Sequence, residues 1–180
     1  MTVLDVGVEH VKKTYYAKLH LSEDTKKHKP DDVERLAGLF YPEHPVRRSM
    51  FIFLLKKAAR EGFAVEDWFL TVCEFVEEYE GVDLSDVREY YIDQRGYMST
   101  TKLNNESQAR ADEILKEQRR GDGYSFYNYV KIYNRVVKDM RVAGLLYKKD
   151  DVYKYSREFK KILKAMIEAL EDFEESGGEE

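Results

Sequence analysis

Residues 137–155 read VKDMRVAGLLYKKDDVYKY, a helical repeat that stops at a glycine and passes directly into two β-prone arms. Val137 and Met140 keep the spacing of one helix face, and Gly144 can take the left-handed conformation that ends a helix. Leu145 is then expected to return to the core beneath that helix. The arms flank a Lys-Asp-Asp turn and contain the apolar and aromatic residues that favour strands. The pattern therefore predicts a helix followed by a β-hairpin.

The rest of the chain predicts helices separated by glycine and proline breaks. Ser125 is a good N-cap for the helix that precedes the hairpin, and Ser156 for a long helix that follows it. Residues 97–101 break the helical pattern and suggest a short strand. The expected helices are 6–20, 30–41, 46–60, 65–79, 84–94, 106–120, 125–142 and a C-terminal one with an apolar stripe at residues 159, 162, 163, 166, 170 and 173.

The helix that ends in Gly144-Leu145-Leu146 and the hairpin after it resemble the recognition helix and wing of winged helix-turn-helix DNA-binding domains. This resemblance covers about 30 residues of the C-terminal half. It implies a mainly α fold in which a helical module precedes a winged domain with a β-hairpin and a long C-terminal helix. Small winged-helix proteins of archaeal plasmids and viruses are similar in size and composition.

Within the winged domain, helix 84–94 is expected to be the first helix, 97–101 the edge strand and 106–120 the second helix. The alternative register makes 106–120 the first helix and splits 124–142 in two. We favour the former, because the latter leaves a very short second helix. The expected domains are 1–81 (helical module), 82–176 (winged domain and C-terminal helix) and 177–180 (acidic tail).

Charge is distributed unevenly, although the net charge is only −5. Residues 116–164 carry 14 Lys and Arg against 6 Asp and Glu, whereas residues 165–180 carry 7 acidic residues and no basic ones. A basic block of this kind is the electrostatic footprint expected of a polyanion-binding surface.

The face of helix 125–142 opposite its apolar stripe carries residue types suited to DNA. Arginine can bind guanine through two hydrogen bonds, asparagine can bind adenine, and lysine neutralises phosphate. The candidate DNA-binding residues of this helix are Asn128, Lys131, Asn134, Arg135, Lys138 and Arg141. Those flanking it are Arg119, Arg120, Lys148, Lys149 and Lys154.

Seven of the fourteen tyrosines lie between residues 124 and 155. Their hydroxyls could bind phosphate, but we favour core or rim positions, because tyrosine packs well in small cores and on strands. Asp150 and Asp151 at the wing tip argue against deep insertion into the minor groove.

Motifs of other function classes are missing from the sequence. The four histidines are scattered, and there is no zinc spacing, phosphate-binding glycine loop or nucleophile elbow, so no enzyme activity, metal or cofactor is expected. The longest apolar run, residues 50–55, is too short to span a membrane. One cysteine and no visible secretory signal suggest the cytoplasm.

The resulting hypothesis is a transcriptional regulator that binds double-stranded DNA by inserting helix 125–142 into the major groove. In winged-helix regulators a C-terminal helix commonly pairs two subunits, so a homodimer through residues 157–173 is expected. The alternative for this helix is packing on helices 46–80 of its own chain. The alternatives for function are a protein-interaction adaptor, with a partner groove at residues 50–76, and a replication-origin or RNA-binding protein.

Overall fold

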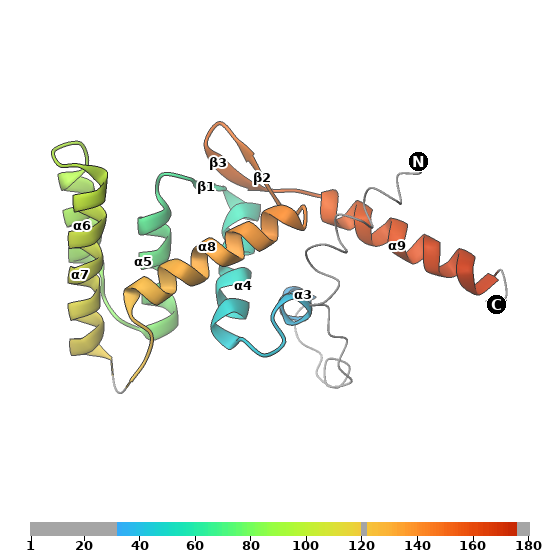
Figure 1. Ribbon diagram of the computed structural model, residues 1–180, viewed down its shortest axis with the longest axis horizontal. Coiled ribbons are helices and arrows are strands. Elements are labelled where there is room, and N and C mark those ends of the chain that lie inside the picture. Colours follow the sequence, from blue (N-terminus) through green and yellow to red (C-terminus); the bar gives the residue numbers. More distant parts are fainter. Residues whose placement is uncertain (1–31, 120–121, 176–180) are drawn as a thin grey trace.

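The protein is mainly α-helical, with one small antiparallel sheet (Figure 1). The computed structural model describes residues 32–119 and 122–175, and the expected helix 6–20, Arg120 and the tail 177–180 lie outside them. The described helices are α3 (Asp32–Phe40), α4 (Pro45–Arg60), α5 (Trp68–Glu80), α6 (Ser85–Gln94), α7 (Thr100–Gln118), α8 (Phe126–Val142) and α9 (Glu158–Glu175). The strands are β1 (Phe63–Ala64), β2 (Leu146–Lys149) and β3 (Val152–Tyr155).

The helix-to-hairpin transition predicted from residues 137–155 is confirmed. Gly144 has φ 76° at the end of α8, and Leu145 is 2% exposed beneath it. β2 and β3 pair with Lys149 opposite Val152, so the hairpin turns through two residues. These two, Asp150 and Asp151, have φ 51° and 57°, the positive values of a type I′ turn, whose twist suits a tight hairpin.

The third strand of the sheet does not come from the expected segment. Residues 97–101 form no strand: Arg95 and Met98 make an isolated bridge, and α7 already begins at Thr100. The edge of the sheet is β1, in which Phe63 pairs with Tyr153, giving the order β1-β3-β2. The third strand of the sheet is therefore β1, which precedes α5, and the expected strand before α7 does not form.

The core joins segments on both sides of the expected boundary at residue 81. One cluster of buried side chains runs from Ala37 on α3 to Tyr153 on β3. α8 is a single unbroken helix that packs across α4 and α5 (Figure 1), so the register that splits it is wrong. Residues 32–81 are thus part of the same packed unit as α8 and the hairpin, not a separate module.

α6 and α7 follow α5 and precede α8 in the chain, and they form an antiparallel helical hairpin at one end of the molecule (Figure 1). The ring of Tyr91 on α6 stacks on Phe69 of α5, with centroids 4.5 Å apart. Ser99 caps α7 by accepting a hydrogen bond from the Lys102 N–H, so α7 starts about a turn and a half before the expected helix.

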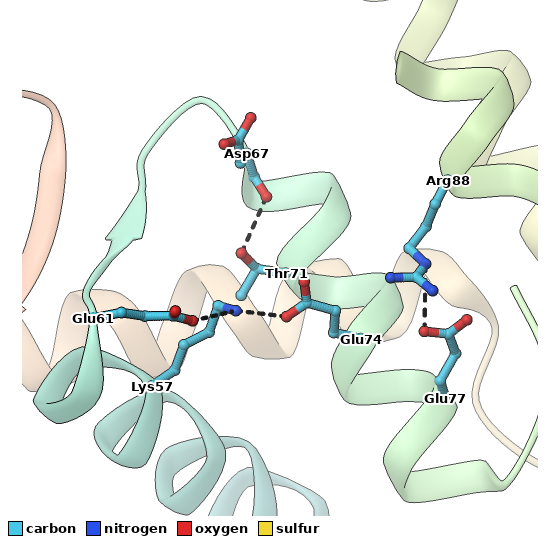
Figure 2. Close-up of polar contacts among 7 residues, drawn as sticks. All are labelled: Lys57, Glu61, Asp67, Thr71, Glu74, Glu77 and Arg88. Carbon is cyan, nitrogen blue, oxygen red and sulfur yellow. Dashed lines mark hydrogen bonds and ion pairs between the residues drawn. The ribbon is translucent and has the colours of Figure 1, made fainter. Parts of the chain in front are cut away.

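Ion pairs connect α4, α5 and α6 at the surface (Figure 2). Lys57 Nζ lies 2.7 Å from Glu74 Oε2 and 3.4 Å from Glu61 Oε1. Arg88 Nε lies 3.5 Å from Glu77 Oε2. Burial opposes the charge on Lys57, but the two glutamates outweigh it and raise the pKa of this lysine above its ordinary value. These pairs help to fix α5 between its two neighbours.

α9 leaves the body of the molecule after its first turn (Figure 1). The Phe159 N–H donates to the Gly144 carbonyl at 3.2 Å, and the Phe159 ring lies 5.7 Å from that of Phe40. Among the α9 side chains that the structure describes, Phe159 is the one packed against the core. The expected alternative, in which this helix packs along residues 46–80, is not the arrangement observed.

Candidate nucleic-acid interface

The two faces of α8 are sharply different. Its buried face is apolar and aromatic, and consists of Phe126, Tyr129, Val130, Tyr133, Val136, Val137 and Met140, each at most 8% exposed. Its exposed face carries Lys131, Asn134, Arg135, Lys138 and Arg141. At 3.6 residues per turn these five side chains cover one continuous side of the helix. We call them the α8 polar face.

Three cations of this face are available to a polyanion. Among the described residues, no carboxylate lies within ion-pair distance of Lys131, Lys138 or Arg141. Lys131 Nζ lies 4.4 Å from the ring centre of Tyr127, one helical turn earlier. Arg141 Cζ lies 5.7 Å from the ring centre of Tyr153 on β3, so the α8 polar face continues to the hairpin.

Arg135 differs from these three because it contacts a carboxylate of its own helix. Its Nε donates to Asp139 Oδ2 at 3.1 Å, and its side chain is 45% exposed. Asp139 is only 3% exposed and also accepts a hydrogen bond from the Tyr41 hydroxyl at 2.6 Å. The spacing of four residues between Arg135 and Asp139 is a sequence pattern that indicates this ion pair. The residues around Tyr41 give no indication that its hydroxyl binds Asp139.

The hairpin adds lysines beyond the end of α8. Lys149 and Lys154 are exposed, and the pairing of β2 with β3 puts them on the same outer face as Tyr147. Lys148 lies on the other face, and its Nζ is 2.7 Å from Asp151 Oδ1. Lys148 thus has a carboxylate partner, whereas Lys149 and Lys154 have none in the part of the chain that the structure describes.

Arg119 is turned into the protein, which corrects the expectation that it contacts the DNA backbone. Its side chain is 13% exposed, and Nη1 donates to Glu80 Oε1 at 3.1 Å and to the Tyr124 carbonyl at 2.8 Å. The Tyr129 hydroxyl donates to the same Glu80 oxygen. Burial, and then the contact with Glu80, raise the pKa of Tyr129, which keeps this hydroxyl protonated.

These contacts fix the start of α8. Ser125 Oγ accepts from the Asn128 N–H at 3.3 Å, as the predicted cap requires. Asp112 on α7 accepts from the Phe126 N–H at 2.5 Å and places a negative charge where the helix dipole favours it. Asn128 itself is half-buried, so it lies at the edge of the α8 polar face.

The tyrosines divide between the core and the surface. Tyr129, Tyr133 and Tyr153 are buried, as expected. Of the seven tyrosines between residues 124 and 155, the other four are each 39% to 54% exposed: Tyr124 and Tyr127 at the start of α8, and Tyr147 and Tyr155 on the hairpin. They add hydroxyl donors to the surface that the lysines form.

A groove of about 530 Å³ lies on another side of α4, where this helix meets α5. Ile52, Phe53 and Phe75 form its apolar part, and Lys56 and Arg60 lie at its rim. Most of the residues that line this groove belong to the apolar segment 50–76 that the adaptor hypothesis singled out.

Within residues 32–119 and 122–175, no cluster of three or more histidine, cysteine or carboxylate side chains is placed to hold a metal ion. None of the described helices combines the length and the apolar composition that a membrane span needs. Comparisons with protein-family models, with curated protein sequences and with solved structures give no match.

Proposed function

We propose that this chain is a double-stranded DNA-binding protein, a transcriptional regulator that inserts α8 into the major groove and performs no catalysis. The observation that carries the proposal is the α8 polar face, which is exposed along the helix and continues to the hairpin through Arg141. A helix of 10–12 Å diameter fits a major groove about 12 Å wide.

The topology supports a winged helix-turn-helix with a different assignment of its parts. In this assignment α4 is the first helix, β1 the edge strand, α5 the second helix, α8 the recognition helix and the β2–β3 hairpin the wing. The packing of α8 on α4 and α5, and the pairing of β1 with β3, support it. The α6–α7 hairpin is then an insertion between the second helix and the recognition helix.

A homodimer through residues 157–173 belongs to the same proposal. Beyond Phe159, α9 extends away from the body (Figure 1), and Ile162 and Leu163 lie on its apolar stripe. Two copies paired through α9 would present two recognition helices to successive turns of one DNA face. Four acidic residues, Glu171, Asp172, Glu174 and Glu175, lie at the C-terminal end of α9, away from α8 (Figure 1), where they would not repel the bound DNA.

The test is a gel shift with random-sequence duplex at low and at moderate salt. The wild-type chain is expected to bind at low salt and to release the duplex as salt rises, because phosphate contacts displace counterions. Changing Arg135 and Lys138 together to Glu is expected to abolish binding. The matched control changes Lys56 and Arg60, which lie at the α4–α5 groove, to Glu and should bind like the wild type. Absence of wild-type binding at low salt would overturn the proposal.

The α4–α5 groove favours a second candidate function, a protein-interaction adaptor. Apolar side chains such as Phe53 and Phe75 at a concave surface suit the apolar face of a partner helix. In the same gel shift, an adaptor would leave the duplex unbound by both the wild type and the groove variant. Adding single-stranded RNA as a competitor of the duplex in this gel shift tests the alternative that the protein binds RNA.

A further inference from the structure

Asp139 is the one buried charged side chain among the described residues. It lies near the C-terminal end of α8, where the helix dipole disfavours a carboxylate. A buried carboxylate is strongly unfavourable unless it is paired and hydrogen-bonded. Asp139 lies on the helix that is proposed to bind the bases of DNA. We therefore ask which function would justify the free energy needed to bury its carboxylate.

One oxygen of Asp139 accepts two hydrogen bonds. The Tyr41 hydroxyl donates to Oδ2 from the interior, and Arg135 Nε donates to the same atom from the surface. Contact through Nε leaves both Nη groups of Arg135 without a hydrogen-bond acceptor among the described residues. The guanidinium is thus held at its inner edge while its outer fork faces solvent.

On the basis of the proposed function, we propose that Asp139 is a positioning residue that holds Arg135 ready to bind a guanine in the major groove. The two Nη groups match the O6 and N7 acceptors of guanine, a pattern that only this base presents. Fixing the fork in advance reduces the side-chain entropy lost on binding. Lys131 and Lys138, for which the described residues provide no such carboxylate, bind phosphate and supply affinity without sequence preference.

This role predicts different effects on two measurable quantities, the preference for a guanine-containing site and the affinity for random duplex. Removing the Asp139 carboxylate frees the Arg135 side chain, so preference for a guanine-containing site should fall by about tenfold, the size of one lost bidentate contact. Affinity for random duplex should stay unchanged or increase, because a negative charge near the DNA is lost. A purely structural role of Asp139 would lower both affinities together.

The experiment first selects duplexes from a random pool with the full-length wild-type chain. The ratio of Kd for random duplex to Kd for the selected duplex is then measured at one salt concentration. The main variant combines Tyr41→Phe with Asp139→Leu, which removes both ends of the Tyr41–Asp139 hydrogen bond together, so that neither residue is left facing the other unpaired. Arg135→Lys keeps the charge and replaces the planar fork by a single ammonium group, so it should weaken the preference whether or not the double variant folds. Lys138→Gln is the control that should weaken both affinities and keep their ratio.

Replacing single guanines of the selected duplex by 7-deazaguanine, which lacks the N7 acceptor, identifies the base. Wild-type affinity should fall when one particular guanine is replaced, and the affinity of Arg135→Lys should fall less at that position. Sequence preference retained in both variants would overturn the inference. Salt-sensitive wild-type binding without any guanine preference would overturn the role of Asp139 but not the proposed DNA binding. Absence of any duplex binding would overturn both proposals.

Discussion

Phe63 on β1 lies opposite Tyr153 on β3, with ring centroids 5.3 Å apart, although the two residues belong to opposite halves of the chain. This pair joins the edge strand β1 to the central strand β3 and so connects the segment between α4 and α5 to the hairpin. A fragment of residues 82–180 lacks α4, β1 and α5, on which α8 packs, and should therefore show no cooperative thermal unfolding by circular dichroism. A cooperative transition in this fragment would instead support the domain boundary at residue 81 that was expected from the sequence.

Salt titrations should distinguish the three hairpin lysines. If about six phosphate contacts form, the log–log slope of affinity against salt should be about −5. Lys149→Ala and Lys154→Ala should each make this slope shallower by about one, because each removes one phosphate contact. Lys148→Ala is the matched control and should change it less, because Lys148 is paired with Asp151. Equal changes for all three would contradict the arrangement of the hairpin described above.

Gly62 should tolerate substitution poorly. It has φ +81°, and an added Cβ would lie 2.8 Å from Val152 Cγ1 and 2.9 Å from the Tyr153 carbonyl oxygen. Gly81 also has a positive φ, +69°, but no atom of the described residues lies within 4 Å of an added Cβ there. Gly81→Ala should cost about 1–2 kcal/mol of unfolding free energy from the backbone alone, and Gly62→Ala clearly more. Denaturant unfolding of both variants gives the comparison, and equal costs would contradict the close approach of β3.

The alkaline stability of the protein should depend on Tyr133. Burial raises the pKa of this tyrosine, and no hydrogen-bond partner of its hydroxyl is found in the described part of the chain. The tyrosine hydroxyl of the unfolded chain loses its proton near pH 10. The free energy of unfolding is therefore unaffected by the ionisation of this group below pH 10, and it falls as the pH rises from 10 toward the higher pKa of Tyr133 in the folded protein.

Tyr133→Phe should therefore be neutral or stabilising at pH 7, by up to about 1 kcal/mol, and should reduce the loss of stability above pH 10. Tyr129→Phe is the comparison: it removes a hydroxyl that donates to Glu80 and should destabilise at pH 7. Urea unfolding at pH 7 and pH 11 measures both effects. A large destabilisation by Tyr133→Phe at pH 7 would show that its hydroxyl has a partner.

The oligomeric state should respond to the apolar stripe of α9. Leu163→Asp is expected to convert a dimer to a monomer, because it buries a charge in the proposed interface. Lys161→Ser, on the other side of the helix, is the control and should leave the dimer intact. Sedimentation velocity measures both, and a wild-type chain that sediments as a monomer would remove the dimer from the proposal.

Features that depend on neighbouring residues could be predicted from the sequence. The Ser125 cap, the Gly144 stop and the hairpin turn at Asp150 each follow from a few adjacent residues, and each is confirmed. The same holds for the exposed side of α8, because helical periodicity alone separates Lys131 and Lys138 from Tyr133.

Features that depend on distant partners could not be predicted. β1 has only two residues, too few to show alternation, and it is a strand because β3 lies beside it. Tyr97 and Met98 look β-prone, but Ser99 starts a helix directly after them. Arg119 looks like a surface cation, and only the fold brings Glu80 to it.

The insertion of α6 and α7 also affects how the protein is made. β1 must wait for β3, its partner in the sheet, which is synthesised only after the insertion and α8. Contacts so distant along the chain close large loops and slow folding. In the nascent polypeptide, the apolar side chains of α4 and α5 that pack on α8 and β3 therefore stay exposed until these two elements have emerged. The inserted helical pair can form first, because its own contacts are local.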